Sequence, residues 1–219
     1  MYTYLISDIH GNNLLFRQAL KSVNLRKNDN LIILGDIIDR GPDSKQVLDT
    51  IFLLLEHNFN ITCIKGNHEE MFLDSFKDVN SKINWIRNGG NKTLSSFLTS
   101  EIEKIPKKYI EFIESFKTYI EIDQYILVHA GLNMKIDDPF RDENSLMWLR
   151  DWKGFINKEW LGNRKIIHGH TPLKKDLIQQ QLVDDKQIIC IDNGSYLKES
   201  GYGGLCVLRL DDMKLYFEE

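Results

Sequence analysis

Five short clusters of residues that can bind metal ions recur along the chain. They are DIHG at 8–11, GDIIDRG at 35–41, GNHE at 66–69, HAG at 129–131 and HGHT at 168–171. Each follows a predicted strand, and ligands bind outside the carboxyl ends of strands in open α/β sheets. Taken alone, each cluster could be structural: an acid as a helix cap, a glycine in a turn, a histidine in the core. Five such clusters at one rim would bury unpaired charges at several kcal/mol each, and a bound cation relieves that cost.

The types of ligand indicate the chemistry. Carboxylate, imidazole and an Asn carbonyl without thiolate suit Mn²⁺, with Fe or Zn²⁺ as the other choices. Two such ions about 3.5–4 Å apart, bridged by a carboxylate, can bind phosphate oxygens, acidify a shared water and stabilise an in-line displacement. No Ser or Cys lies in a nucleophile motif beside a base, so we expect hydrolysis in one step, without a covalent phosphoenzyme. The sequence therefore predicts a phosphate ester as the substrate.

The elements that position these clusters can be read from hydrophobic periodicity. Short β-branched or aromatic runs predict strands at residues 2–7, 30–34, 60–65, 125–128, 165–167, 187–191 and 205–210. Between the first three runs, helical spacing predicts helices at residues 12–23 and 44–58. Their apolar faces are predicted to comprise Leu14, Leu15, Ala19 and Leu20 in the first helix, and Val47, Leu48, Ile51 and Leu55 in the second. This βαβαβ order predicts a parallel sheet.

The remaining chain adds a helical segment and antiparallel strands. Residues 69–117 are predicted to be a helical insertion over the sheet, interrupted by Asn88-Gly89-Gly90 and by Pro106, with Asn91 capping a helix at 92–98. Hairpins are predicted at residues 119–128 and 207–217. Because no repeat, low-complexity tract or linker is present, we expect one domain spanning residues 1–219.

Composition narrows the classes of partner and location. The chain has 219 residues, 42% hydrophobic and 27% charged, with Lys+Arg 28, Asp+Glu 32 and a net charge of −4. This balance is typical of a globular protein and disfavours nucleic acid polymers and anionic membranes as partners. Three cysteines without C-x-x-C spacing (Cys63, Cys190 and Cys206) favour a reducing cytoplasm. We expect no export signal and no membrane span, because the longest apolar run is residues 51–55.

The five clusters, in this order, resemble the signature of the calcineurin-like metallophosphoesterase superfamily and, within it, the phosphoprotein phosphatase family. That signature runs G/S-D-x-H-G, G-D-x-x-D-R-G, G-N-H-E, H-A-G and G-H, and its blocks span residues 7–171 here, about three quarters of the chain. The resemblance implies a layered α-β-β-α sandwich of mixed sheets and hydrolysis by metal-bound hydroxide. It also implies two metal groups that share Asp36 as the bridge: Asp8, His10 and Asp36 for one ion, and Asp36, Asn67, His129 and His170 for the other.

The same resemblance implies roles for four further residues. His68 would protonate the leaving oxygen, and Asp39 would orient and charge that imidazole. Arg40 and Arg150 would clamp the phosphoryl oxygens. Structural alternatives stay open for both arginines: Arg40 could tie down the turn before Pro42, and Arg150 could pair with a nearby acid on an exposed helix.

Three features stay open at this point. Glu69 could be an acid favoured by a helix dipole or could act in the site. A G-H-x-H motif would place a second histidine two residues after His170, but that position is Pro172. His168 lies two residues before His170 instead, and packing or an indirect role in the site is favoured for it. The segment from Trp85 to Thr93 resembles an N-G-G-x-x-T-L block of bacterial members and could be either a substrate-facing loop or a packed turn.

Substrate class is the last open question. The resemblance favours a serine/threonine protein phosphatase, because Asp39 and Glu69 fill positions where symmetrical dinucleoside tetraphosphatases usually carry a small residue and Asp. The tetraphosphatase is the runner-up. A catalytically weak binding scaffold is the alternative of another class, disfavoured because every ligand position is filled.

Overall fold

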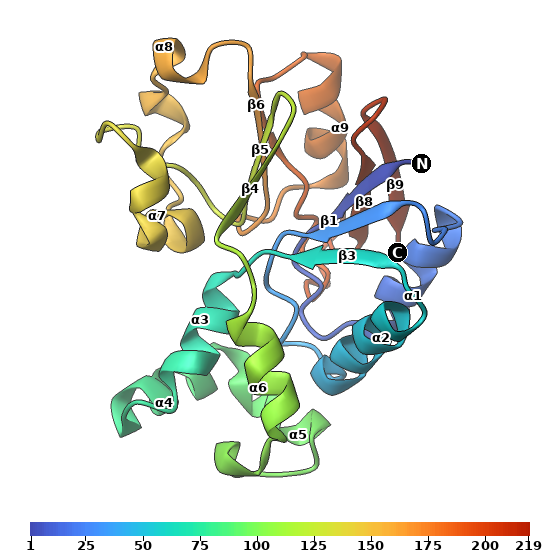
Figure 1. Cartoon of the computed structure of the whole chain (residues 1–219), viewed down its shortest axis with the longest axis vertical. Coiled ribbons are helices and arrows are strands. Elements are labelled where there is room, and N and C mark those ends of the chain that lie inside the picture. The colour runs from blue at the N-terminus through green and yellow to red at the C-terminus, as the bar shows by residue number, and fades with distance from the viewer.

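Two mixed β-sheets packed face to face form the centre of the molecule (Figure 1). The computed structural model describes all residues, Met1–Glu219. One sheet has five strands in the order β3-β2-β1-β8-β9, and the other has four in the order β4-β5-β6-β7. The strands are β1 (Thr3–Ile6), β2 (Asn30–Ile33), β3 (Asn60–Cys63), β4 (Tyr119–Ile122), β5 (Tyr125–Val128), β6 (Lys165–His168), β7 (Ile188–Cys190), β8 (Leu205–Arg209) and β9 (Lys214–Glu218).

Each sheet combines parallel and antiparallel pairs. Strands β1, β2 and β3 are parallel, as are β5, β6 and β7, and this places the carboxyl ends of each set at one edge. The two predicted hairpins supply the antiparallel pairs β4–β5 and β8–β9, and β8 also pairs with β1. The predicted strands and the mixed sheets are thus confirmed.

Alternation along the strands divides their side chains between two hydrophobic layers. In β1, Leu5 enters the layer between the sheets, whereas Tyr4 and Ile6 face the helices. In β6, Ile167 enters the layer between the sheets and Ile166 faces outward. The interior between the sheets is therefore built from both sheets, and helices cover their outer faces, which confirms the α-β-β-α sandwich.

Helices cover the outer face of each sheet. The five-stranded sheet is covered by α1 (Asn13–Ser22) and α2 (Ser44–Glu56), and the four-stranded sheet by α7 (Glu143–Trp148) and α8 (Lys158–Leu161). Helix α9 (Lys175–Val183) contributes Ile178 to the layer between the sheets. The predicted face of α1 was wrong at Leu14, which is 66% exposed, because the buried stripe runs through Leu15, Phe16 and Ala19.

The predicted helical insertion is present between β3 and β4. It contains α3 (Asn67–Asp74), α4 (Val79–Trp85), a π-helical turn (Ile86–Gly90), α5 (Asn91–Ser96), a 3-10 turn (Ile102–Lys104) and α6 (Lys107–Glu114). These helices form the lower part of the molecule in Figure 1. The break falls at Gly89, whose φ is 112°. The prediction that Asn91 caps a helix was wrong: Asn91 is the first residue of α5, and the N-cap position is Gly90, directly after the break at Gly89.

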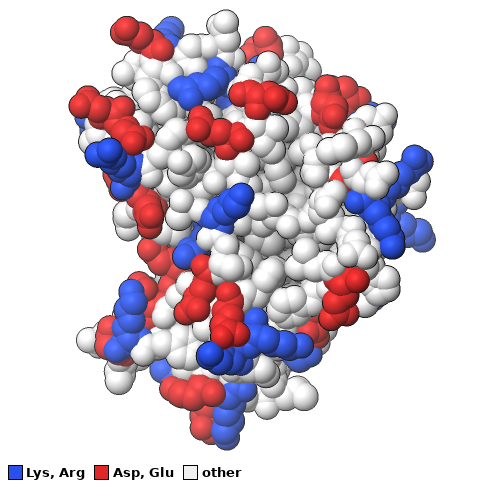
Figure 2. All heavy atoms as spheres, in the orientation of Figure 1, with Lys and Arg blue, Asp and Glu red and all other residues white.

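The surface carries both signs of charge. Figure 2 shows Lys and Arg interspersed with Asp and Glu on one face, without a broad area of either sign. No helix has the length and apolar character needed to cross a membrane.

Candidate di-metal active site

Strained backbone marks the strand ends where the predicted site lies. Six predicted site residues adopt positive φ values: Asp8 (50°), His10 (46°), Asp36 (51°), Asp39 (72°), Arg40 (66°) and His170 (68°). Non-glycine residues adopt this left-handed conformation rarely, and it persists where the surrounding structure holds it. The turns after β1, β2 and β6 thus direct these side chains inward, where five of the six are buried.

One group of ligand atoms surrounds Asp36 on the side of His129. The Nε2 of His129 lies 3.4 Å from Asp36 Oδ1, 3.1 Å from Asn67 Oδ1 and 3.2 Å from His170 Nδ1. The Nδ1 of His170 is 3.0 Å from Asn67 Oδ1. Ligands about 2.1 Å from a shared ion would be separated by about 3.0–3.4 Å, so these spacings fit a single divalent cation.

Hydrogen bonds to backbone carbonyls set the tautomers of two histidines. His129 Nδ1 donates to Leu34 O at 2.7 Å, and His10 Nδ1 donates to Ile38 O at 3.1 Å. Their Nε2 lone pairs therefore point toward Asp36, where carboxylate and amide oxygens offer no proton. The buried Nε2 atoms of His68 and His170 have no hydrogen-bond partner. The Nε2 atoms of His129 and His10 thus converge with the oxygens of Asp36 and Asn67 as acceptors, an arrangement that a cation satisfies.

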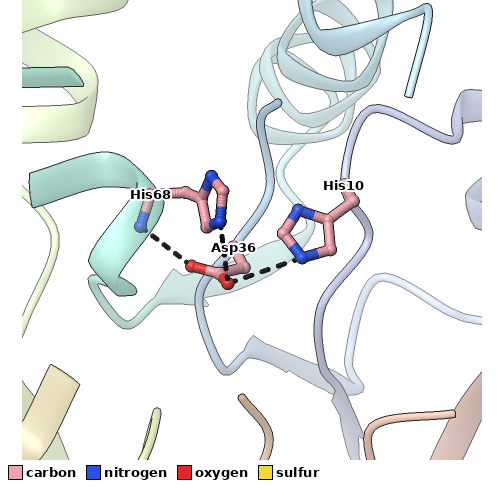
Figure 3. A group of neighbouring side chains, drawn as sticks. All are labelled: His10, Asp36 and His68. Atoms are coloured by element: carbon pink, nitrogen blue, oxygen red, sulfur yellow. Dashed lines mark hydrogen bonds and ion pairs between the residues drawn. The ribbon is translucent and has the colours of Figure 1, made fainter. Parts of the chain in front are cut away.

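A second group lies on the other side of Asp36 (Figure 3). The Oδ2 of Asp36 is 3.5 Å from His10 Nε2 and 4.0 Å from His68 Nε2. The carboxylate of Asp8, predicted as a ligand here, accepts from Ser7 Oγ and from the His170 amide at 3.0 Å. The atoms that lie within 4.8 Å of one another belong to His10, Asp36 and His68, without Asp8.

Burial and the imidazoles act in opposite directions on Asp36. Burial disfavours its charge, but the surrounding imidazoles of His129, His68 and His10 outweigh burial and hold the pKa of Asp36 well below its usual range. Burial lowers the pKa of His170 to about 3, so this imidazole is neutral and can bind a metal. Burial raises the pKa of Asp8 to about 6.

His68 and Asp39 form a buried hydrogen-bonded pair. His68 Nδ1 donates to Asp39 Oδ2 at 2.8 Å, and the His68 amide donates to Asp36 Oδ1 at 3.1 Å. Burial opposes the charge of His68, but Asp36 and Asp39 overcome it and raise the pKa of the imidazole. Burial raises the pKa of Asp39. The pair has the orientation that a general acid with a supporting carboxylate requires.

Both predicted arginines lie at the site. Arg40 Nη1 donates to His10 Nε2 at 2.9 Å, and its guanidinium carbon lies 4.3 Å from the ring centroid of Tyr196. Arg150 Nη1 donates to His170 O at 3.1 Å and to Thr171 Oγ1 at 3.2 Å. The guanidinium of Arg40 therefore lies directly beside the ligand atoms, while Arg150 lies behind His170.

Glu69, left open by sequence, organises the turn that carries Asp36. Its carboxylate is fully buried and accepts from the backbone amides of Asp36 (2.8 Å), Ile37 (2.8 Å), Ile38 (3.3 Å) and Gly66 (2.9 Å). Because each oxygen accepts two amides, the carboxylate joins the turn after β2 to the start of α3. Glu69 is therefore a structural acid of the site and not only a residue near a helix N-terminus.

Sequence reasoning missed the segment after β7. Ser195 Oγ contacts the carbonyls of Asp8 at 2.7 Å and Ile9 at 3.0 Å, and Asp192 is buried beside them. Burial, followed by the nearby Asp8, raises the pKa of Asp192 far above its usual range. The signal that could have found this segment is Asp192-Asn193-Gly194 directly after a predicted strand. His168 packs edge-on against Trp152 at 5.6 Å between ring centroids, and its Nε2 has no partner.

The chain is similar to known phosphoesterases. The model of the calcineurin-like phosphoesterase family matches residues 1–201. Serine/threonine-protein phosphatase 1 of Salmonella typhimurium is 27% identical over 183 residues, 80% of each chain. The symmetrical bis(5'-nucleosyl)-tetraphosphatase of Wigglesworthia glossinidia brevipalpis is 34% identical over 145 residues, which are 63% of this chain and 47% of that relative.

A solved structure shows the same fold. A protein serine/threonine phosphatase from Saccharomyces cerevisiae superposes with a TM-score of 0.68 over all of this chain and 79% of its own, at 17% identity. The family model covers most of the chain, and the groups of histidine and aspartate side chains around Asp36 are suited to bind metal ions. The chain belongs to the calcineurin-like phosphoesterase family and is a metal-dependent phosphoester hydrolase.

Proposed function

We propose that this chain dephosphorylates phosphoserine and phosphothreonine in proteins with two divalent ions, Mn²⁺ foremost and Fe or Zn²⁺ as alternatives. The observation that carries the proposal is the convergence of unprotonated imidazole, carboxylate and amide acceptors on Asp36, next to the His68–Asp39 pair. The name of the Salmonella relative supports the substrate class.

The proposed ligands divide around Asp36 as the resemblance implies. Asp8, His10 and Asp36 would hold one ion, and Asp36, Asn67, His129 and His170 the other. When bound, these ions would supply Lewis acidity to the phosphoryl oxygens and lower the pKa of water. The short contacts around His129 Nε2 support the second group more directly than the first.

The other residues would bind and protonate the substrate. Arg40 would turn from His10 to the phosphoryl oxygens, and Arg150 would join it from beside His170. His68, held by Asp39 through Nδ1, would donate its Nε2 proton to the leaving oxygen. The chain therefore supplies binding and the acid, and no side chain forms a bond to phosphorus.

Hydrolysis of dinucleoside tetraphosphates is the second candidate. The name of the Wigglesworthia relative favours it, although the match covers about half of that relative. Asp39 and its contact with His68 favour the protein phosphatase, because a strongly basic serine or threonine alkoxide needs protonation by a general acid more than a weakly basic nucleotide leaving group does. The cytoplasm as location stays a prediction.

The test measures Mn²⁺-dependent phosphate release from a phosphothreonine peptide and cleavage of diadenosine tetraphosphate by the same purified protein. We expect peptide turnover that exceeds dinucleotide turnover. We also expect Asp36→Asn to lose turnover and His68→Asn to lower kcat by about 10²-fold or more with metal still bound. Preferential cleavage of diadenosine tetraphosphate into two nucleoside diphosphates would show that the chain acts as a tetraphosphatase. Absence of turnover on both substrates would leave the binding scaffold.

A further inference from the structure

The carboxylate of Asp39 is held from the helical insertion as well as from His68. Thr93 Oγ1 donates to Asp39 Oδ1 at 2.6 Å, and Trp85 Nε1 lies 3.1 Å from Oδ1 and 2.9 Å from Oδ2. The Asp39 amide lies 3.0 Å from both Thr93 Oγ1 and Ser44 Oγ. All of these groups are buried. Trp85 and Thr93, which we name the Asp39 clamp, are 46 and 54 residues distant in sequence from the acid that they bind.

Two glycines between the clamp residues let the insertion approach this closely. A Cβ on Gly90 would lie 2.3 Å from the Trp85 ring, and a Cβ on Gly89 would lie 2.7 Å from the amide of Arg40. The Arg40 amide in turn donates to Gly89 O at 3.4 Å. The segment from Trp85 to Thr93 thus packs directly on the backbone of Asp39 and Arg40. This close packing explains why the segment contains the Gly-Gly pair and the threonine.

The clamp determines the direction in which Asp39 faces. Asp39 and Arg40 both have positive φ, so their own backbone does not favour the observed turn. With Oδ1 taken by Thr93 and the indole N–H bridging both oxygens, Oδ2 remains for His68 Nδ1. That bond orients the imidazole so that its Nε2 faces the Asp36 side of the site.

We propose that Trp85 and Thr93 are positioning residues for general-acid catalysis, acting on His68 through Asp39. This rests on the proposed phosphomonoesterase function. In the step concerned, water adds to phosphorus, the ester P–O bond breaks, and the His68 Nε2 proton passes to the leaving oxygen. The products are an alcohol and inorganic phosphate, and solvent takes the proton of the attacking water and restores that of His68.

The proposal predicts a dependence on the leaving group. An alkoxide leaving from phosphothreonine needs protonation in the transition state, whereas p-nitrophenolate is stable without it. Loss of a positioning residue should therefore slow the peptide far more than p-nitrophenyl phosphate. A residue that only stabilises the fold, or one that only binds the phosphoryl group, would slow both substrates alike.

The test compares kcat and KM for both substrates in Thr93→Val, which removes the hydroxyl at nearly constant shape, and in Thr93→Ser, which retains it. We expect Thr93→Val to lower kcat on the peptide about 10- to 100-fold with KM within about 2-fold, and kcat on p-nitrophenyl phosphate less than about 3-fold. The kcat of Thr93→Ser on the peptide should lie within about 3-fold of the kcat of the natural chain. Thr99→Val is the matched control, because Thr99 lies in the same insertion and its hydroxyl contacts only Glu101. Trp85→Phe should show the same selectivity.

A measurement without turnover tests the contact itself. The indole N–H resonance of Trp85, identified by its loss in Trp85→Phe, should lie downfield in an ¹⁵N–¹H correlation spectrum and move upfield in Asp39→Asn. An unmoved resonance, or equal loss on both substrates in Thr93→Val and Trp85→Phe, would overturn the clamp. If His68→Asn shows the leaving-group selectivity and both clamp variants do not, only the clamp fails. If the natural chain hydrolyses neither ester, the proposed function fails.

Discussion

The acidic residues at the site differ in how burial and neighbouring charges affect them. Asp36 lies among imidazoles and stays ionised, whereas Asp8 accepts the His170 amide and its pKa is raised to about 6 by burial. Burial and then the nearby charge of Asp36 raise the pKa of Glu69 to about 7, and hydrogen bonds from the amides of Gly66 and Ile37 oppose that shift. A cation at the predicted ligands would therefore meet Asp36, which is already charged, and Asp8, which must release a proton.

Metal binding should depend on pH through Asp8. Because the folded, metal-free pKa of Asp8 is raised to about 6, its carboxyl carries a proton below that pH, and a cation must displace it. We expect Mn²⁺ affinity to fall about tenfold per pH unit below pH 6 and to level off above it. Isothermal titration calorimetry in two buffers of different ionisation enthalpy counts the protons released.

Asp8→Asn is the informative variant for that measurement. It should bind at least one ion more weakly and release fewer protons at pH 5.5. Unchanged affinity and proton release in Asp8→Asn would contradict its predicted role as a ligand, and His10 and Asp36 would then hold the first ion without it.

At the scale of elements, the site depends on how closely separate turns approach. The start of α3 touches the turn after β2, because Glu69 accepts from Gly66 and from the amides of Asp36 and Ile37. Gly66 faces the bridging acid: a Cβ there would lie 2.2 Å from Asp36 Oδ1 and 2.5 Å from the Asp36 amide. A strand end and a helix start are thus packed with no room for one methyl group.

Gly66→Ala should therefore displace Asp36 without changing any ligand. We expect loss of about 1–3 kcal/mol of unfolding free energy and a fall of at least tenfold in Mn²⁺ affinity, measured by urea denaturation and calorimetry. Gly154→Ala is the control, because no atom lies within 4 Å of a Cβ built at that exposed position. Equal metal affinity in the two variants would show that the turn after β2 can move without disturbing the site.

At the scale of the whole molecule, the two sheets share one interior. Leu5, Ile32 and Leu208 from the five-stranded sheet pack in the same cluster as Leu127 and Ile167 from the four-stranded sheet. Site residues also come from both sheets, since Asp36 follows β2 and His129 follows β5. Neither sheet can bury its inner face without the other, so we expect the chain to unfold as one unit.

Leu208→Ala tests whether the chain unfolds as one cooperative unit. Leu208 is fully buried between the sheets, so its truncation should cost about 2–5 kcal/mol and keep one urea transition, with coincident circular dichroism and tryptophan fluorescence. Leu98→Ala should cost less than about 0.5 kcal/mol, because Leu98 is 95% exposed. Two separated transitions would contradict the single domain predicted for residues 1–219.

The sequence by itself determined the features that depend on neighbours along the chain. The βαβαβ order, both hairpins, the helical insertion and the clusters at strand ends all follow from local periodicity, turn residues and ligand types, and the structure contains these elements at those places. Helix details such as the exposure of Leu14 were wrong, since adjacent leucines fit the spacing of either face and only packing on the sheet selects one.

Only the tertiary structure decided which distant groups meet. The His170 amide binds Asp8 across 162 positions, Thr93 binds Asp39 across 54, and Ser195 contacts Asp8 across 187. Periodicity carries no information about such pairs, because they form when turns of different elements converge and each buried polar atom must find a partner. Those contacts decide how Asp8 and Asp39 are oriented, which their residue types alone leave open.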